Sequence, residues 1–102
     1  MKFYRVTVGD IGIYEAVDRD CPKGDPRRAN KPDGGWLPKK GMDFPGAVSY
    51  WTEHGWKTYQ DSGLYKWHTS VVSGKVMIEE IDERPEEVLY EDAYQIIVPK
   101  RL

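Results

Sequence analysis

The sequence predicts an α+β fold: a small mixed or antiparallel sheet of about four strands, two short helices, and one long loop rich in proline and glycine. Two apolar stretches near the C-terminus, 76–81 and 88–98, are rich in Val, Ile and Tyr, which favour half-buried strands. Residues 2–8 have the period-two pattern of side chains that is typical of a strand, and they predict a third one. Because strands occur on several sides of two helical stretches, and the two C-terminal strands are expected to be paired or close neighbours, the order is typical of α+β domains.

The length and composition indicate one domain with an aromatic core. The chain has 102 residues, among them four Trp and seven Tyr. Each large ring removes roughly 150–250 Å² from water when buried. Cys21 is the only cysteine, which excludes an internal disulfide. No apolar run approaches the roughly 20 residues of a membrane span, and the N-terminus turns polar too early for a signal peptide. We therefore expect a soluble, cytoplasmic protein with no membrane partner.

The N-terminal part predicts a strand followed by a short helix. Residues 2–8 form the strand, and Gly9 ends it. Asp10 is predicted to cap a helix that begins at residue 11 or 12 and continues to about residue 20. Pro22 ends this helix, because the residue before a proline is disfavoured in the helical conformation.

The composition of the stretch 22–46 predicts that it forms a long loop inside the single domain 1–102. It contains five of the seven prolines and five of the ten glycines, and it has no usable periodicity. Loops of this length are uncommon in compact domains and are often functional or mobile. We expect the apolar residues at 36–37 and 42–44 to anchor the loop and its tip at 23–33 to be mobile.

After the loop, the sequence predicts a strand at 47–51 and a second helix. Thr52 can cap a helix that begins at Glu53, whose carboxylate favours the positive end of the helix dipole. The sequence Asp-Ser-Gly at 61–63 predicts an early end to this helix and the start of a further turn through Trp67.

The charges are unevenly distributed. The loop 22–46 carries six basic residues against three acidic ones, whereas 79–92 carries eight acidic residues against Arg84 alone. Both patches fit solvated surfaces, and either one also fits a binding surface for a partner of opposite charge. One functional hypothesis is therefore a non-enzymatic protein-interaction module that uses exposed aromatic residues and an acidic strand edge. Its protein partner would bind through the acidic segment or through the basic loop.

Nucleic-acid binding is a further hypothesis for the basic loop. Trp36 could stack on a base while the neighbouring cations contact phosphates, namely Arg27, Arg28, Lys31, Lys39 and Lys40. The formal net charge of −2 disfavours a nucleic-acid partner, because it provides no overall attraction to a polyanion.

The common catalytic and metal-binding motifs are missing from the sequence. His54 and His68 are 14 residues apart, without the spacing of a zinc motif, and we expect no metal. The sequence also has no glycine-rich turn of the kind that binds phosphates between a strand and a helix. Adjacent carboxylates such as Glu79 and Glu80 point to opposite faces of a strand and cannot share one site.

Three segments in order nevertheless suggest a family. They are 4–7 on the first strand, 49–52 leading into the helix that contains Tyr59, and 86–90 followed by 94–96 on the last strand. Their order of arginine, serine and glutamate resembles that of ADP-ribosyltransferase-like folds.

This resemblance implies an enzyme that binds NAD. It assigns contacts with the phosphate or ribose side of NAD to Arg5, and it assigns the nicotinamide pocket to Ser49 or Thr52, with Tyr59 as a further cofactor-binding residue. Glu87 would be the catalytic residue, binding the ribose and stabilising the oxocarbenium-like transition state. A guanidinium suits the anionic cofactor. Arg5, Thr52 and Glu87 also fit structural roles as a surface strand residue, a helix cap and part of a solvated bend.

Overall fold

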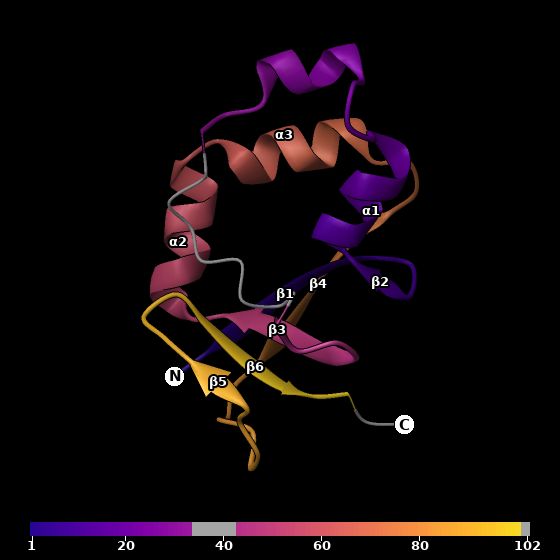
Figure 1. Ribbon diagram of the computed structural model, residues 1–102. Helices are drawn as coiled ribbons and strands as arrows, with labels where there is room; N and C mark the ends of the chain where they lie inside the picture. Colours follow the sequence, from indigo (N-terminus) through magenta and orange to yellow (C-terminus); the bar gives the residue numbers. More distant parts are fainter. Residues whose placement is uncertain (34–42, 101–102) are drawn as a thin grey trace.

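The computed structural model describes residues 1–33 and 43–100. In these residues the chain forms six strands, three α-helices and one 3-10 helix (Figure 1). In chain order they are β1 (Phe3–Val8), β2 (Ile11–Gly12), α1 (Ile13–Asp20), η1 (Pro26–Asn30), β3 (Ala47–Trp51), α2 (Glu53–Asp61), α3 (Leu64–Val71), β4 (Val76–Ile81), β5 (Tyr90–Glu91) and β6 (Gln95–Pro99). The predicted α+β class is confirmed, but the prediction of about four strands and two helices is too low for the described residues.

The six strands form one antiparallel sheet in two parts. Its main path runs β2-β1-β3-β6-β5, and β4 pairs with β1 off this path. β4 pairs with β1 over its whole length, whereas β1 meets β3 at the single pair Tyr4 and Trp51. β3 and β6 pair over five positions. The part made of β4 and β1 is therefore joined to the part made of β3, β6 and β5 by a narrow contact.

The core lies on both sides of this sheet. The larger cluster fills the space between the sheet and the helices, which Figure 1 shows gathered at one end of the molecule, and it consists of Val6, Val8, Ile13, Ala16, Val17, Cys21, Tyr59, Leu64, Trp67 and Val71. A smaller cluster joins Phe3 to Ile96 and Val98 of β6. Because Phe3 and Val6 lie on opposite faces of β1, that strand contributes a buried side chain to the core on each side of the sheet.

The helix ends follow local sequence signals except at the N-terminus of α1. The N-cap of α1 is Gly12, which makes no side-chain cap, so the prediction that Asp10 caps this helix is wrong. Residues 9 and 10 instead form the turn between β1 and β2, and Gly9 adopts the left-handed conformation (φ 61°) that this turn requires. Thr52 caps α2 as predicted, with its hydroxyl oxygen accepting from the Gly55 N–H at 3.0 Å.

The segment 22–33 is not the irregular tip that its composition suggests. It contains η1, whose first turn is capped by the Asp25 carboxylate accepting from the Arg27 N–H at 2.9 Å. Arg27 donates to the carbonyl of Asp20 at 2.8 Å, and Trp67 Nε1 donates to the carbonyl of Arg27 at 3.2 Å. These bonds fasten η1 to α1 and α3. The mobility predicted for 23–33 stays a prediction.

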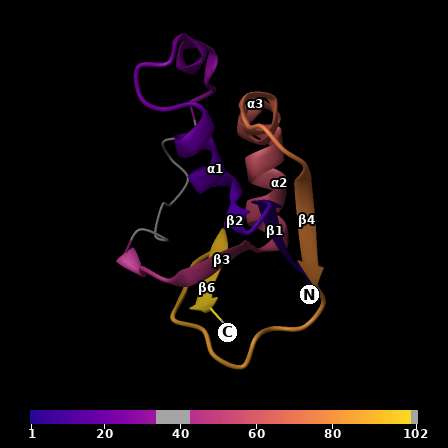
Figure 2. The ribbon, with the colours of Figure 1, turned by 90° about the vertical axis from the view of Figure 1, so that its right-hand side faces the viewer.

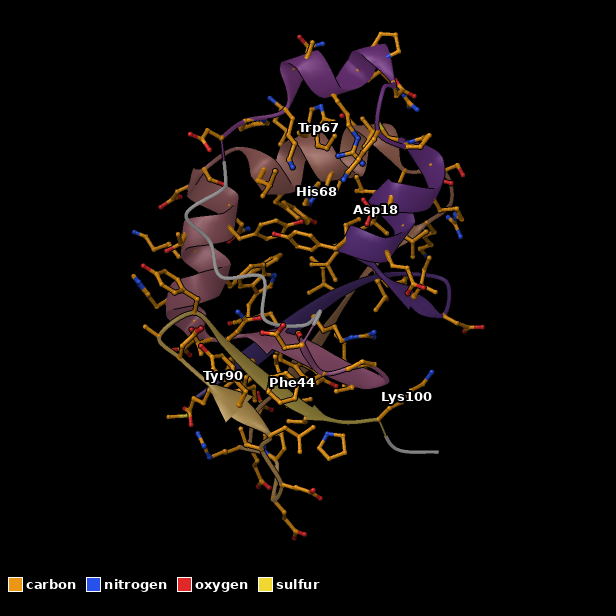
Figure 3. All side chains as sticks on the ribbon, in the orientation of Figure 1. Asp18, Phe44, Trp67, His68, Tyr90 and Lys100 are labelled. Carbon is orange, nitrogen blue, oxygen red and sulfur yellow. The ribbon has the colours of Figure 1, made fainter. Side chains whose placement is uncertain are left out.

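The predicted anchors of the loop fall partly outside the structure. Trp36, Leu37 and Met42 lie outside the described residues. Phe44 is half-buried, and its ring packs against that of Tyr90 with 5.9 Å between the centroids (Figure 3). The anchor predicted at Phe44 is therefore present.

The C-terminal strands differ most from the prediction. β4 pairs with β1 and not with the last strand, so the expectation that 76–81 and 88–98 are paired or close neighbours in the sheet is wrong. The stretch 88–98 is also not one strand. The Asp92 carboxylate accepts from the N–H groups of Tyr94 and Gln95, at 2.8 and 2.9 Å, and this turn separates β5 from β6.

Candidate functional site

Among the described residues, β4 is the longest strand that has no partner on one of its sides. β4 pairs with β1 at all six of its positions, and no segment within residues 1–33 or 43–100 pairs with its other side. Figure 2 shows β4 at the outer margin of the molecule. An edge strand of this kind presents a row of backbone donors and acceptors to solvent, which is a template for pairing with another chain.

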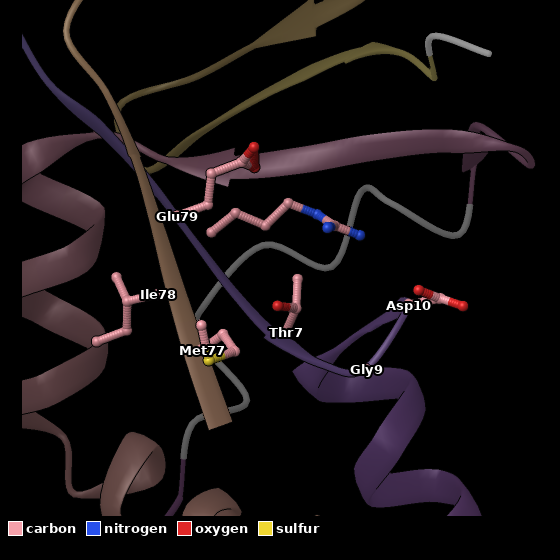
Figure 4. A pocket seen from close by; sticks show the side chains of 7 residues that line it. Thr7, Gly9, Asp10, Met77, Ile78 and Glu79 are labelled. Carbon is pink, nitrogen blue, oxygen red and sulfur yellow. The ribbon is translucent and has the colours of Figure 1, made fainter. Parts of the chain in front are cut away.

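The side chains of β4 are also exposed. Met77 and Ile78 are 49% and 48% exposed. Since consecutive residues of a strand point to opposite faces, each face of the edge carries one of them, and Figure 4 shows Ile78 on the other side of the strand from Glu79. Glu79 and Glu80 follow and are exposed as well. Each face of β4 therefore presents an apolar side chain and then a carboxylate.

The two carboxylates of β4 are held in place by neighbouring residues. Tyr50 of β3 donates from its hydroxyl to Glu79 at 2.7 Å, and Lys2 forms an ion pair with Glu80 at 2.7 Å. Burial, followed by the bond to Glu79, raises the pKa of Tyr50 to about 12. The bond to Glu80 likewise raises the pKa of Lys2. These contacts fix the direction of both carboxylates while leaving oxygen atoms open to solvent.

The acidic surface continues beyond the strand. Four exposed carboxylates in the connection from β4 to β5 make no hydrogen bond or ion pair with the described residues: Asp82, Glu83, Glu86 and Glu87. The Arg84 guanidinium donates to both oxygens of Glu91 and lowers the pKa of that carboxyl, so this cation is paired with a carboxylate of β5. The apolar Leu89 is 43% exposed at the end of this connection. We call β4 together with 82–89 the acidic edge.

An open depression of about 350 Å³ lies beside the acidic edge, between β1, the turn after it and β4. Figure 4 shows its lining, which comprises Arg5, Thr7, Gly9, Asp10, Met77, Ile78 and Glu79. Arg5 lies opposite Glu79 in the register of β1 and β4. Its guanidinium makes no hydrogen bond or ion pair among the described residues. The depression thus combines one available cation with two carboxylates.

The five residues predicted from the family resemblance lie in different environments. Arg5 lines the depression just described, and Thr52 lines a separate one near the N-terminus. Ser49 lies on β3 opposite Ile97 of β6. The structure thus does not bring these three into one depression.

Tyr59 and Glu87 differ most in exposure. Tyr59 is completely buried, and its hydroxyl is hydrogen-bonded to His68 Nδ1 at 2.6 Å. Its ring stacks on Trp51 with 4.9 Å between the centroids, and burial raises the pKa of its phenol. Glu87 is exposed in the connection 82–89 and belongs to no strand, as the alternative of a solvated bend predicts. The roles that the resemblance assigns to these residues remain predictions.

The exposed pair Met77 and Ile78 was missed by the sequence analysis, although a signal for it exists. Glu79 and Glu80 are adjacent within one strand, so carboxylates point to both of its faces. A strand with charges on both faces cannot be covered on either face at that point without burying a charge. Adjacent acids inside an apolar strand are therefore a sign of an exposed edge.

The described residues offer no metal site and no membrane-spanning helix. No group of three or more His, Cys, Asp or Glu side chains in 1–33 and 43–100 could hold a metal ion. Within the same residues, every helix is too short or too polar to cross a membrane.

No family model, curated protein or solved structure matches this chain.

Proposed function

We propose that this chain is a non-enzymatic protein-interaction module that binds an extended basic segment of a partner protein along the acidic edge. The observation that carries the proposal is the six-residue β4, whose outer side has no strand partner among the described residues and whose Met77 and Ile78 are about half exposed. Addition of a strand to such an edge derives its affinity from main-chain hydrogen bonds and its specificity from alternate side chains.

Charge determines the class of partner. Glu79 and Glu80 lie on the strand, and four further exposed carboxylates follow it that make no hydrogen bond or ion pair with the described residues. A cationic segment would pair with these groups, while an acidic segment would be repelled by them. The same charges oppose non-specific pairing of the open edge with other strands.

The basic loop is the weaker of the two predicted binding surfaces. Arg27 and Arg28 donate to backbone carbonyls of Asp20 and Cys21, each at 2.8 Å. Arg28 also forms an ion pair with Asp18 at 3.2 Å. Two cations of this loop therefore serve to fasten η1, which favours the acidic edge as the binding surface and disfavours a nucleic-acid partner.

A titration with a labelled peptide of alternating lysine and valine residues tests the proposal. We expect fluorescence anisotropy to detect binding at low ionic strength, weakening as salt screens the charges. The amide resonances of 76–81 should shift as the peptide binds. Glu83→Lys should weaken binding severalfold, whereas Asp61→Lys, the same charge change on an exposed position of α2, should have a much smaller effect. Equal effects of the two variants, or unchanged resonances in β4, would contradict the proposal.

One observation favours a second function, the NAD-binding activity implied by the resemblance to ADP-ribosyltransferase-like folds. Arg5 lines an open depression, and its guanidinium makes no hydrogen bond or ion pair with the described residues, which leaves it able to contact an anionic cofactor. In that case millimolar NAD raises the melting temperature, because any ligand of the folded state stabilises it. Arg5→Ala should abolish the increase, and Glu87→Gln should abolish turnover without unfolding the domain. An unchanged melting temperature with NAD would exclude this function.

A further inference from the structure

We infer that the acidic edge selects the direction of the bound segment: a strand that runs antiparallel to β4, with basic residues first and apolar residues after them. This inference rests on the proposed function and adds the sequence pattern of the partner. It derives from the unequal halves of β4 and from the antiparallel pairing of the whole sheet.

The first half of β4 is apolar and the second half is acidic. Val76, Met77 and Ile78 precede Glu79 and Glu80, and the acidic character continues after the strand at 82–83. Since the side chains alternate between faces, the change from apolar to acidic occurs on both faces at the same point along the strand. A strand of six residues spans roughly 20 Å, so the two halves are far enough apart to contact different residues of a partner.

Cross-strand pairs convert this arrangement into a sequence requirement. Side chains directly opposite each other in a strand pair have their Cβ atoms roughly 4.5–5.5 Å apart. The residues opposite Glu79 and Glu80 should therefore be Lys or Arg. Those opposite Met77 and Ile78 should be apolar, and β-branched residues fit best. A segment with the two classes in the wrong order would place its cations against the apolar half.

The direction follows from the sheet itself. All strand pairs formed by the described residues are antiparallel. Antiparallel pairing is also slightly more stable per residue than parallel pairing. A segment antiparallel to β4 meets the acidic half with its N-terminal residues and the apolar half with its C-terminal residues. The basic residues of the partner therefore precede its apolar ones.

A second copy of this chain is a poor occupant of the edge. Consider two copies whose β4 strands pair antiparallel with the two Ile78 residues opposite each other. Each Glu79 would then lie opposite Met77 of the other copy, and each Glu80 would lie opposite Val76. In the register that sets the two Glu79 residues opposite each other, their carboxylates would face each other directly. Either register leaves charges without a partner or sets like charges opposite, and both arrangements destabilise the pair.

Two peptides of identical composition test the direction. One has three lysines followed by Val-Ile-Val, the other has the reverse order, and both carry the same label and blocked ends. We expect the lysine-first peptide to bind about tenfold more tightly, because two or three cross-strand pairs of ordinary strength are satisfied only in that order. The double variant Glu79→Gln with Glu80→Gln should bring the ratio close to one, while Asp61→Asn should leave it unchanged.

The outcomes separate the direction from the function. Equal affinities of the two peptides, or tighter binding of the valine-first peptide, would overturn the inferred direction. The proposal that the chain is a protein-interaction module would not be affected. If neither peptide binds at low ionic strength, the proposed function fails and the inference fails with it. Concentration-dependent dimerisation in sedimentation experiments, abolished by Ile78→Lys, would identify a second copy as the occupant and overturn the inference.

Discussion

β4 and β6 are both short antiparallel strands that contain Ile and Val, but they differ in burial and in pairing. Both are short strands rich in Ile and Val, yet β4 is mostly exposed, whereas the first four residues of β6 are all buried. β6 is paired on both sides, with β3 and with β5, while β4 is paired only with β1 among the described strands. Ile97 is 0% exposed and Ile78 is 48% exposed. The same residue type therefore stabilises the fold in one strand and is available for contacts in the other.

The difference arises from two adjacent residues. Glu79 and Glu80 place a carboxylate on each face of β4, and burying either face would desolvate a charge at a cost of several kcal/mol. β6 has no charged residue, and its one buried polar side chain, Gln95, lies at the beginning of the strand. Both faces of β4 therefore stay uncovered at this point, and its outer side, which has no strand partner among the described residues, is open to recognition.

The largest expected effect on stability comes from truncating one isoleucine in each of the two strands. Ile97→Ala should lower the free energy of unfolding by about 2–5 kcal/mol, because it removes buried methylene groups and leaves a cavity. Ile78→Ala should cost less than about 1 kcal/mol, since half of that side chain is already in water. Urea denaturation followed by tryptophan fluorescence measures both values. Similar losses in the two variants would show that β4 is as buried as β6.

A second variant tests the packing of α2 against the turn that leads into β6. A Cβ atom added at Gly55 would lie 1.9 Å from the carbonyl oxygen of Tyr94, a contact that requires the backbone to move. Gly55→Ala should therefore destabilise the domain by about 1–3 kcal/mol. Gly12→Ala is the matched control, because the nearest atom to its added Cβ is an Arg5 guanidinium nitrogen at 3.8 Å. A neutral Gly55→Ala would contradict this packing.

A third variant weakens the hydrogen bonds at the same junction. Thr52 donates from its hydroxyl to the carbonyl of Ala93 at 2.8 Å while accepting from the Gly55 N–H. Thr52→Ala should lower the free energy of unfolding by about 0.5–2 kcal/mol, the usual cost of losing an N-cap. In the control Thr69→Ala, the lost hydroxyl bonds only to the Lys66 carbonyl within its own helix. Equal thermal stability of the two variants would show that Thr52 does not fasten this turn.

The sequence predicted the features that depend on neighbouring residues. The strands at 3–8 and 47–51, the cap at Thr52 and the helix break before Leu64 all follow from local periodicity and capping chemistry. Gly63 at this break adopts φ 83°, as a turn between two helices requires.

The features that depend on distant contacts could not be predicted in the same way. The pairing of β4 with β1 joins residues that lie more than 65 positions apart in the chain, and hydrophobic pattern alone does not select between strand partners. Arg27 donates hydrogen bonds to backbone carbonyls at the ends of two helices, and its charge alone does not predict these bonds. For the candidate site, the sequence indicated the acidic edge as one of two charged surfaces. It predicted one strand over 88–98, because the turn at Asp92 was not recognised.

The smallest expected effect concerns the contact between the two parts of the sheet. Burial and the bond to Glu79 raise the pKa of Tyr50 from 10.0 to about 12. A phenol whose pKa is higher in the folded than in the unfolded state contributes stability below pH 10, and this contribution is lost as the pH rises towards 12. Glu79→Gln should lower the pKa of Tyr50 but leave it above 10, because burial is the larger cause of the shift.

Absorbance at 295 nm, with Tyr50→Phe subtracted, measures this titration. Glu83→Gln is the control, because Glu83 is exposed and makes no hydrogen bond or ion pair among the described residues. A pKa for Tyr50 that is unchanged in Glu79→Gln would mean that β3 and β4 do not meet at this bond. The carboxylate of Glu79 would then be less fixed in direction than the proposed recognition of a basic segment requires, and Glu80, held by Lys2, would be the better-placed of the two contacts for the partner.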